Sequence, residues 1–286
     1  MRIDAHHHLW RLARGDYGWL TPALAPIYRD FELSDLAPLL AAAQIDATIL
    51  VQAAPTEAET TFLLDIAEAA DVVRGVVGWA DFDAADAVAR IDGLAVRNLL
   101  VGLRPMVQDI SDDDWLLRPA LAPKLAAMIK HDLVFDALVL PRHVRRLIRI
   151  ADEHPGLQFV LDHCAKPRLA THDLDDWKAD VALLAQRPNI VCKLSGLVTE
   201  ATPDWQVADL REAVDHALTH FSPQRLLWGS DWPVVNLAGG YERWLAAAEQ
   251  LLAGLSAEDK AAIFGGNAAR IYLARRGKRV AQDVTK

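Results

Sequence analysis

The stretch RIDAHHHLW, residues 2–10, is a short apolar strand pattern that runs into three consecutive histidines. Side chains alternate across a strand, so Asp4, His6 and His8 are expected on one face and His7 on the other. Two imidazoles separated by one residue can therefore reach the same point where the strand ends. An isolated pair of this kind also fits a packed core histidine, so the rest of the chain has to separate the two interpretations.

Short apolar strand patterns recur along the chain, and amphipathic helical patterns lie between them. The predicted strands lie near residues 2–6, 46–52, 73–79, 99–104, 133–138, 157–163, 190–195 and 226–231. They are continuous apolar runs, which is typical of parallel strands buried on both faces. Eight strand–helix units in about 250 residues predict an α/β fold of the (β/α)8, or TIM-barrel, type. A doubly wound open sheet is the alternative, but no glycine-rich dinucleotide fingerprint follows the first strand.

Two of the helical stretches carry recognisable start signals. Ser34 is the expected N-cap of the helix in SDLAPLLAAA, and Thr56 with Glu59 makes an expected capping box at the next helix. Neither a linker nor a change in composition divides the chain. One barrel domain is therefore expected over residues 1–275, including extra helices at its end, followed by a polar tail at 276–286.

The composition of the 286-residue chain narrows the classes of partner. A net charge of −9 argues against nucleic acid, because binding to phosphates needs excess basic residues. The chain has no apolar run of about 18 residues, so no membrane span is expected, and no signal-peptide pattern opens it. Its two cysteines, Cys164 and Cys192, lie in apolar runs, which favours a reducing cytoplasm over a disulfide framework.

Two later strands also end in ionisable residues. QFVLDHCAKP places His163 where the sixth strand stops, and RLLWGSDWP places Asp231 where the eighth stops. In this barrel the carboxyl ends of the strands meet at one face, so these side chains should converge with His6 and His8. Three imidazoles and a carboxylate are a set that one divalent ion such as Zn²⁺ would accept. His7 is expected to support them.

Several motifs together resemble one branch of a known superfamily. They are DAHHHLW, YGWL, RDFELSDL, VQAAPTEAET, VGLRP, LDHCAKP, CKLSGL, WGSDWP and FGGNAARIY. The chain resembles the sugar-lactonase branch of the amidohydrolase superfamily, which includes L-fuconolactonases, L-rhamnonolactonases and the related 2-pyrone-4,6-dicarboxylate lactonases. The resemblance implies hydrolysis of a lactone, most simply a six-carbon aldonolactone of the fucose or rhamnose type. It places the site on His6, His8, His163 and Asp231.

The chain departs from the binuclear members of that superfamily. Those members carry a bridging lysine on a middle strand and two separate histidines on later strands. Here the corresponding strands end in GLRP, LVFDAL and KLSG, so a two-metal site is not expected. Either one divalent metal or none remains open, because the pyrone-dicarboxylate lactonases are described as working without one.

Lactone opening needs a base, an oxyanion stabiliser and a proton for the leaving alkoxide. Asp231 is the expected general base, which takes a proton from water and later delivers it to the ring oxygen. A metal on His6, His8, His163 and Asp231 would polarise the carbonyl or the water. Without a metal, the protonated imidazoles would donate hydrogen bonds to the oxyanion.

Five further residues are expected to contact the substrate. Arg104 ends the fourth strand and offers a fork of donors, although it also fits a structural ion pair. Gln52 ends the second strand, and Lys166 follows His163; each also fits a structural or solvated role. Trp19 and Trp232 offer flat apolar faces to a sugar ring, although most tryptophans pack in cores.

Two other classes of function compete with the lactonase. Some decarboxylases of aromatic or muconate-type acids resemble amidohydrolases with a similar first strand, and they would be expected to hold a metal tightly. A sugar-binding barrel without catalysis is the third class, and it has no need of an ionised Asp231 beside three imidazoles. The sequence leaves open the sugar, the ring size of the lactone and the oligomeric state.

Overall fold

The computed structural model describes residues 1–274, and its centre is one sheet of eight parallel strands in sequential order. The strands are β1 (Ile3–His7), β2 (Ala47–Val51), β3 (Val73–Gly78), β4 (Leu100–Leu103), β5 (Val134–Ala137), β6 (Phe159–Leu161), β7 (Ile190–Leu194) and β8 (Leu226–Trp228). Each coincides with a predicted strand, with small differences at the ends. The predicted tail, residues 276–286, lies outside the described residues.

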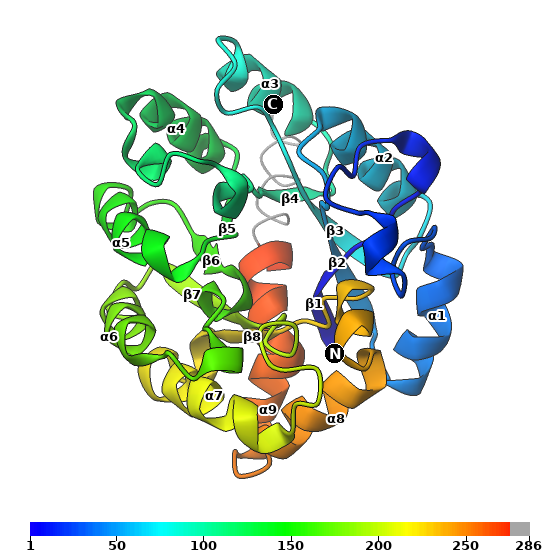
Figure 1. The fold of residues 1–286 in the computed structure, drawn as a ribbon. Helices are drawn as coiled ribbons and strands as arrows, with labels where there is room; N and C mark the ends of the chain where they lie inside the picture. Colours follow the sequence, from blue (N-terminus) through cyan, green and yellow to red (C-terminus); the bar gives the residue numbers. More distant parts are fainter. Residues whose placement is uncertain (275–286) are drawn as a thin grey trace.

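Helices surround the strands and cover their outer face, as Figure 1 shows in a view down the ring of strands. They are α1 (Leu33–Ala42), α2 (Glu57–Glu68), α3 (Ala87–Leu94), α4 (Ala122–Lys130), α5 (Val144–Glu153), α6 (Asp175–Leu184), α7 (Val207–Phe221), α8 (Tyr241–Leu251) and α9 (Ala257–Ala261). The alternation of strand and helix confirms the predicted (β/α)8 barrel. Within residues 1–274 no helix has the length and apolar character that a membrane crossing requires.

The first and last strands are joined only near their carboxyl ends. The amide of Asp231 donates to the His6 carbonyl at 2.8 Å, and the amide of His8 donates to the Trp232 carbonyl at 2.7 Å. These two hydrogen bonds hold the segment after β8 against the end of β1. The closure of the barrel therefore sets Asp231 beside His6 and His8.

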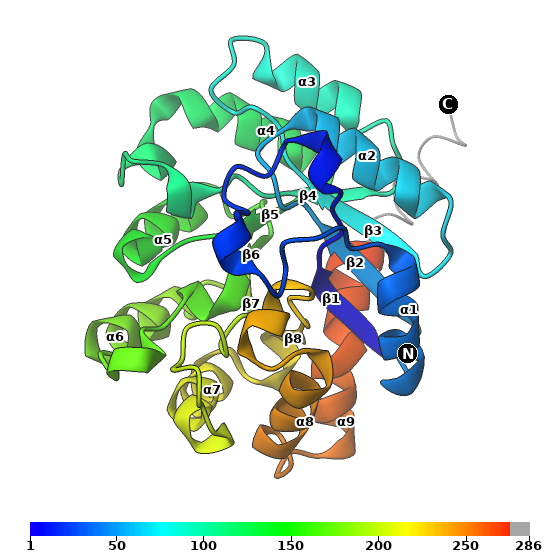
Figure 2. The ribbon, with the colours of Figure 1, turned by 45° about the vertical axis from the view of Figure 1, so that its right-hand side comes forward.

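The barrel interior is apolar near the amino ends of the strands. Small and branched side chains point inward from the strands: Ile3, Ala5, Ala47, Ile49, Val51, Val77, Val101, Val134, Val160, Val191 and Leu227. The C-terminal segment Ala269–Leu273, which follows the segment Ala262–Gly266, supplies Ile271 and Tyr272 to this cluster. Figure 1 shows this part of the chain, in red, across the centre of the ring, and Figure 2 shows it behind β1. It closes the end of the barrel opposite the predicted site.

The predicted helix starts need two corrections. The cap of α1 is Glu32 and not Ser34, because the Asp35 carboxylate reaches back to the Glu32 amide at 2.9 Å. At α2 the Thr56 hydroxyl accepts from the Glu59 amide at 3.0 Å, as in a capping box. The Glu59 carboxylate does not return to Thr56; it accepts from the amides of the preceding loop.

Candidate active site

A β-bulge interrupts the pairing of β1 with β2 between Asp4 and His7. The bulge adds a residue to the strand, so Ala5 and His6 both face the barrel interior. The Asp4 carboxylate turns toward α8, and its Oδ1 accepts a hydrogen bond from the Ser230 amide at 2.9 Å. The expectation that Asp4 shares a face with His6 is therefore wrong.

The structure brings His6 and His8 together at the carboxyl end of β1, where their Nε2 atoms lie 3.2 Å apart. Nδ1 of His8 lies 2.8 Å from the Val51 carbonyl oxygen. A carbonyl only accepts, so Nδ1–H of His8 is the donor and its Nε2 is left for the site. His7 points to the other side of the strand, with its Nε2 2.9 Å from Oγ1 of Thr48.

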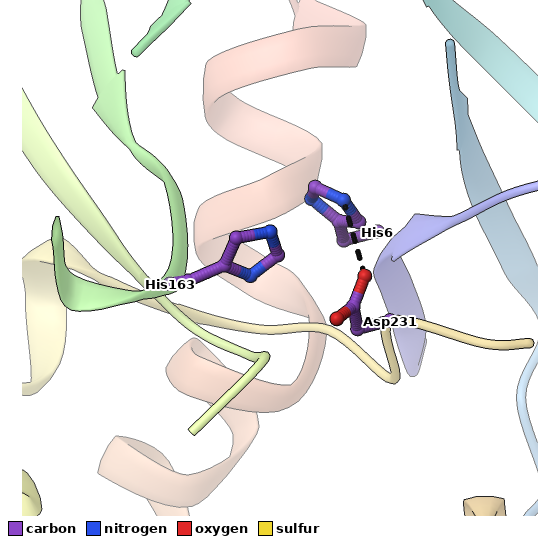
Figure 3. A group of neighbouring side chains, drawn as sticks. All are labelled: His6, His163 and Asp231. Atoms are coloured by element: carbon purple, nitrogen blue, oxygen red, sulfur yellow. Dashed lines mark ion pairs between the residues drawn. The ribbon is translucent and has the colours of Figure 1, made fainter. Parts of the chain in front are cut away.

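Asp231 follows β8 and has a left-handed φ of 58°. Its Oδ1 lies 3.3 Å from Nε2 of His8 and 3.6 Å from Nε2 of His6, and Figure 3 shows the second of these contacts. Burial alone would raise the pKa of this carboxyl. The charge interaction with His163 and the hydrogen bond with His8 lower the pKa by more than burial raises it. The net pKa lies below the ordinary range, so Asp231 is ionised at neutral pH.

His163 follows β6 and begins four consecutive left-handed residues, 163–166. Such a conformation costs about 1–3 kcal/mol per non-glycine residue and recurs at functional sites. Nδ1 of His163 lies 2.9 Å from the Ser195 hydroxyl, and its ring centroid lies 4.6 Å from that of His6. A Cβ on Gly196, whose φ is 61°, would lie 2.5 Å from Nδ1 of His163. Only glycine leaves room for the imidazole.

Burial sets the protonation of both inner imidazoles. It lowers the pKa of His163 to about 4, against the opposing effect of Asp231. It also lowers the pKa of His6 well below its ordinary value, with a further contribution from the Lys193 ammonium. Both rings are therefore neutral at pH 7, beside an ionised Asp231.

These groups lie at a cavity of about 300 Å³ over the carboxyl ends of the strands, which we call the strand-end cavity. The predicted site residues on its wall are His8, His163, Asp231, Arg104, Lys166 and Trp19. His6 lies just beneath them and is fully buried. The loop after β1, dark blue in Figure 2, crosses this face of the barrel. The strand ends thus converge on one concave site.

Arg104 reaches the site from the end of β4 and is almost completely buried. Its NH1 lies 3.3 Å from Oδ2 of Asp162 and 3.4 Å from Nε2 of His6, and its NH2 donates to the Gln52 carbonyl. Nε2 of Gln52 in turn donates to the Arg104 carbonyl at 2.7 Å. Gln52 is fully buried and does not line the strand-end cavity. It holds Arg104 in place and is too deeply buried to be one of the expected substrate contacts.

The two predicted tryptophans have different surroundings. Trp19 is 36% exposed and lies on the cavity wall. Trp232 is 2% exposed and packs edge-on against Phe31, with ring centroids 5.1 Å apart. Lys166 lies on the wall, with its Nζ 3.7 Å from Oε1 of Glu200. Trp19 and Lys166 can meet a ligand, whereas Trp232 is a packing residue.

A layer of buried charges lies beneath the histidines. Nζ of Lys193 on β7 lies 2.5 Å from Oδ2 of Asp136 on β5, 3.1 Å from Oδ1 of Asp162 and 3.3 Å from Nδ1 of His6. The Tyr272 hydroxyl donates to Asp136, with 2.9 Å to each carboxylate oxygen. The side chains of Lys193, Asp136 and Asp162 are completely buried. We call these three residues the buried charge layer.

Sequence reasoning missed this layer, although a signal is present. Three strands repeat an aliphatic residue followed two positions later by a charged one: Val134 and Asp136, Val160 and Asp162, Val191 and Lys193. Residues two apart share a face of a strand. On the inward face of each of these strands, the apolar residue is therefore followed by an ionisable residue that lies nearer the site.

The model of the amidohydrolase family matches residues 3–273. The chain belongs to the amidohydrolase family. An L-fucono-1,5-lactonase of Burkholderia ambifaria is 45% identical over 275 residues, covering 95% of each chain. An L-fucono-1,5-lactonase of Burkholderia multivorans is 39% identical, covering 95% of this chain and 96% of the relative.

Solved structures agree with this amidohydrolase barrel. An amidohydrolase of Burkholderia multivorans superposes with a TM-score of 0.89 at 37% identity, over 95% of this chain and 99% of that one. One crystal form of that protein holds HEPES and another holds zinc. A probable 2-pyrone-4,6-dicarboxylic acid hydrolase of Acinetobacter baumannii has a TM-score of 0.77 at 18% identity over 94% and 98% of the two chains, which supports the fold alone.

The donor set of the site fits one divalent metal ion. His6, His163 and Asp231 each offer a ligand atom, and these atoms lie within 4.8 Å of one another, as Figure 3 shows. Two neutral imidazoles and a carboxylate are the forms that bind a metal, and three protein ligands leave a position for water. His8, predicted as a fourth ligand, adjoins this group of three: its Nε2 lies 3.2 Å from Nε2 of His6 and 3.3 Å from Oδ1 of Asp231.

Proposed function

We propose that the protein is a lactonase that hydrolyses a sugar lactone to the aldonic acid. L-fucono-1,5-lactone, or a similar six-carbon aldonolactone, is the proposed substrate. The two relatives named L-fucono-1,5-lactonase match this chain over nearly their whole length. The observation that carries the proposal is the ionised Asp231 carboxylate on the wall of the strand-end cavity, beside the neutral His6 and His163.

Asp231 acts as the proton carrier in the proposed reaction. It accepts a proton from water as the water oxygen bonds to the lactone carbonyl carbon. The tetrahedral intermediate then breaks its bond to the ring oxygen, and Asp231 returns the proton to that oxygen. A carboxyl with a low pKa is a weak base but a strong acid, so the second transfer is the easier one. A positioned acid–base group of this kind contributes roughly 10²–10⁴-fold in rate.

His6, His163 and Asp231 would hold one Zn²⁺. Such an ion supplies Lewis acidity, which acidifies bound water and offsets the weak basicity of Asp231. Arg104 has an NH1 group near the Nε2 atom of His6, so its guanidinium can donate to the carbonyl oxygen as negative charge develops there. Lys166 and Trp19 complete the proposed substrate contacts, at the hydroxyls and at a ring face.

We also propose a reducing cytoplasm as the location of the protein. Cys164 and Cys192 are both buried and free, with their Sγ atoms 3.5 Å apart. Two neighbouring thiols that stay unbridged suit a compartment in which thiols are kept reduced.

The test is a panel of aldonolactones assayed with a pH indicator, with and without a chelator, and with the metal content measured on the same sample. Acid release from L-fucono-1,5-lactone is expected. A decarboxylase that is given an aromatic acid would instead take up protons from the solution as it releases CO₂. An alkaline shift with such an acid, together with stable lactones, would overturn the proposal. Activity that survives removal of the metal would assign the chemistry to the side chains alone.

A further inference from the structure

A second cavity of about 520 Å³ adjoins the strand-end cavity. The two share Trp19, Met106 and Asp109 as a common wall. The Trp19 indole is fixed between them, because its N–H donates to the Ala53 carbonyl at 2.7 Å and its ring meets Trp10 edge-on. The second cavity therefore lies next to any ligand that occupies the strand-end cavity, along these three shared residues.

The second cavity is walled by aromatic rings from two loops, and we call it the aromatic cavity. Trp79 and Phe82 follow β3, and Trp115 comes from the loop after β4. The Thr60 hydroxyl fixes the backbone of Trp79, by accepting from its amide at 2.7 Å and donating to its carbonyl at 2.8 Å. Asp83 holds the Trp115 indole N–H at 3.1 Å. These rings are preorganised before any ligand arrives.

The two cavities differ in their charged groups. Arg104 and Lys166 line the strand-end cavity together with the carboxylates of Asp231, Glu200 and the shared Asp109. Four aspartates line the aromatic cavity, and no lysine, arginine or histidine of residues 1–274 does so: Asp16, Asp81, Asp83 and Asp109. Arg14 and Arg118 neutralise Asp16 and Asp83 at 2.5 and 3.3 Å. No ion pair within the described residues involves Asp81 or Asp109. Oδ1 of Asp81 accepts from the Asp83 amide at 3.0 Å, and Oδ2 of Asp109 accepts from Nε2 of Gln108 at 3.4 Å, so the second oxygen of each carboxylate is available to a ligand.

We propose that the aromatic cavity binds a neutral sugar ring that is joined through a hydroxyl to the lactone in the strand-end cavity. This inference rests on the proposed function and extends its substrate class to glycosyl-substituted aldonolactones. Flat rings pack on the apolar face of a sugar, and carboxylates accept hydrogen bonds from its hydroxyls. The unpaired aspartates would repel a substituent that carries a carboxylate or phosphate.

An organic cation is the competing occupant, because aromatic rings and carboxylates also attract positive charge. The neutral sugar is favoured because two of the four aspartates are already paired with arginine, so the charge of the cavity is partly cancelled. The remaining acceptors, Asp81 and Asp109, suit the hydroxyl groups of a ring that packs on Trp79.

The experiment compares each lactone with the same lactone glycosylated at one ring hydroxyl in turn. In the wild type, the preferred glycosylated lactone should have a kcat/KM about tenfold above that of its parent, mostly through KM. Trp79→Ala should abolish this gain and leave the kcat/KM of the parent lactone unchanged. Trp79→Phe keeps a ring and should retain most of the gain, and Asp81→Asn should reduce it.

Three results would overturn the inference. They are the absence of a gain at every hydroxyl, a gain that persists in Trp79→Ala, and a larger gain from a trimethylammonium substituent than from a sugar. A failure of the proposed function gives a different pattern, because the parent lactones would then not react at all. In that case, methyl glycosides titrated against tryptophan fluorescence should still bind the wild type more tightly than Trp79→Ala, and equal binding would reject the aromatic cavity as a sugar site.

Discussion

Two layers of ionisable side chains lie one above the other inside the barrel, and they differ in their access to water. In the upper layer, His163 and Asp231 have left-handed backbones and 4% exposure on the wall of the strand-end cavity. In the buried charge layer, Lys193 lies between Asp136 and Asp162 with no exposure at all. Ionisable side chains thus serve both an open site and a closed salt bridge within one barrel.

The difference shows that an ionisable residue inside a barrel is not by itself a catalytic one. A charge that is removed from water needs partners on every side, and Lys193 has two carboxylates and an imidazole. Asp231 has imidazoles on one side and the cavity on the other, which leaves an oxygen available to a ligand. Variants in the two layers should therefore fail in different ways.

The largest expected effect is on activity, from the upper layer. Asp231→Asn should lower kcat by roughly 10²–10⁴-fold, because it removes the proton carrier. Asparagine tolerates the left-handed backbone at this position, so the unfolding free energy should change little. Lactone turnover and urea denaturation on the same preparation provide the measurement. Unchanged turnover would remove Asp231 from the mechanism.

The buried charge layer should show the reverse. Lys193→Met leaves Asp136 and Asp162 without their shared cation and should cost about 3–5 kcal/mol of unfolding free energy. Lys178→Met is the matched control. It breaks ion pairs with Asp175 and Glu212 on the surface and should cost less than about 1 kcal/mol. Equal losses in the two variants, measured by urea denaturation, would contradict the difference between the layers.

Gly196→Ala tests the support of the upper layer. The added methyl group would overlap the His163 imidazole and also strain a positive φ. A displacement of about 1 Å at a catalytic group costs roughly 10²-fold in rate, so kcat should fall by about that factor. Zinc affinity, measured by competition with a chromophoric chelator, should fall as well. Gly254→Ala, at a site with open space, is the control and should leave both values unchanged.

The smallest effect concerns Glu59, a buried carboxyl outside both layers. Its oxygens accept from the amides of Ala53 and Ala54, and burial raises its pKa to about 7. Because the folded-state pKa is above the unfolded one, the stabilisation is complete below about pH 4.5 and is lost as the pH rises through 7. From pH 5 to pH 8 the wild type should lose on the order of 2 kcal/mol relative to Glu59→Gln in urea unfolding. If the unfolding free energies of the wild type and Glu59→Gln changed with pH in the same way, Glu59 would not titrate in this range.

Much of the fold could be predicted from local pattern. Buried parallel strands are continuous apolar runs, and all eight were found from that feature alone. The start of α1 was misplaced, because whether Ser34 or Glu32 caps the helix depends on the orientation of Asp35. Side-chain orientations of this kind are set by three-dimensional contacts that sequence spacing does not specify.

The sequence by itself determined the order of strands and helices and the face on which His6, His8, His163 and Asp231 meet, because parallel strands in a barrel end at one edge. Only the tertiary structure decided which side chains reach the cavity. A bulge in β1 turns Asp4 away, Gln52 and Trp232 are buried by their neighbours, and Lys193 lies among carboxylates from other strands. Strand alternation is a local property of the chain, whereas burial and charge pairing depend on segments that come together only in the folded barrel.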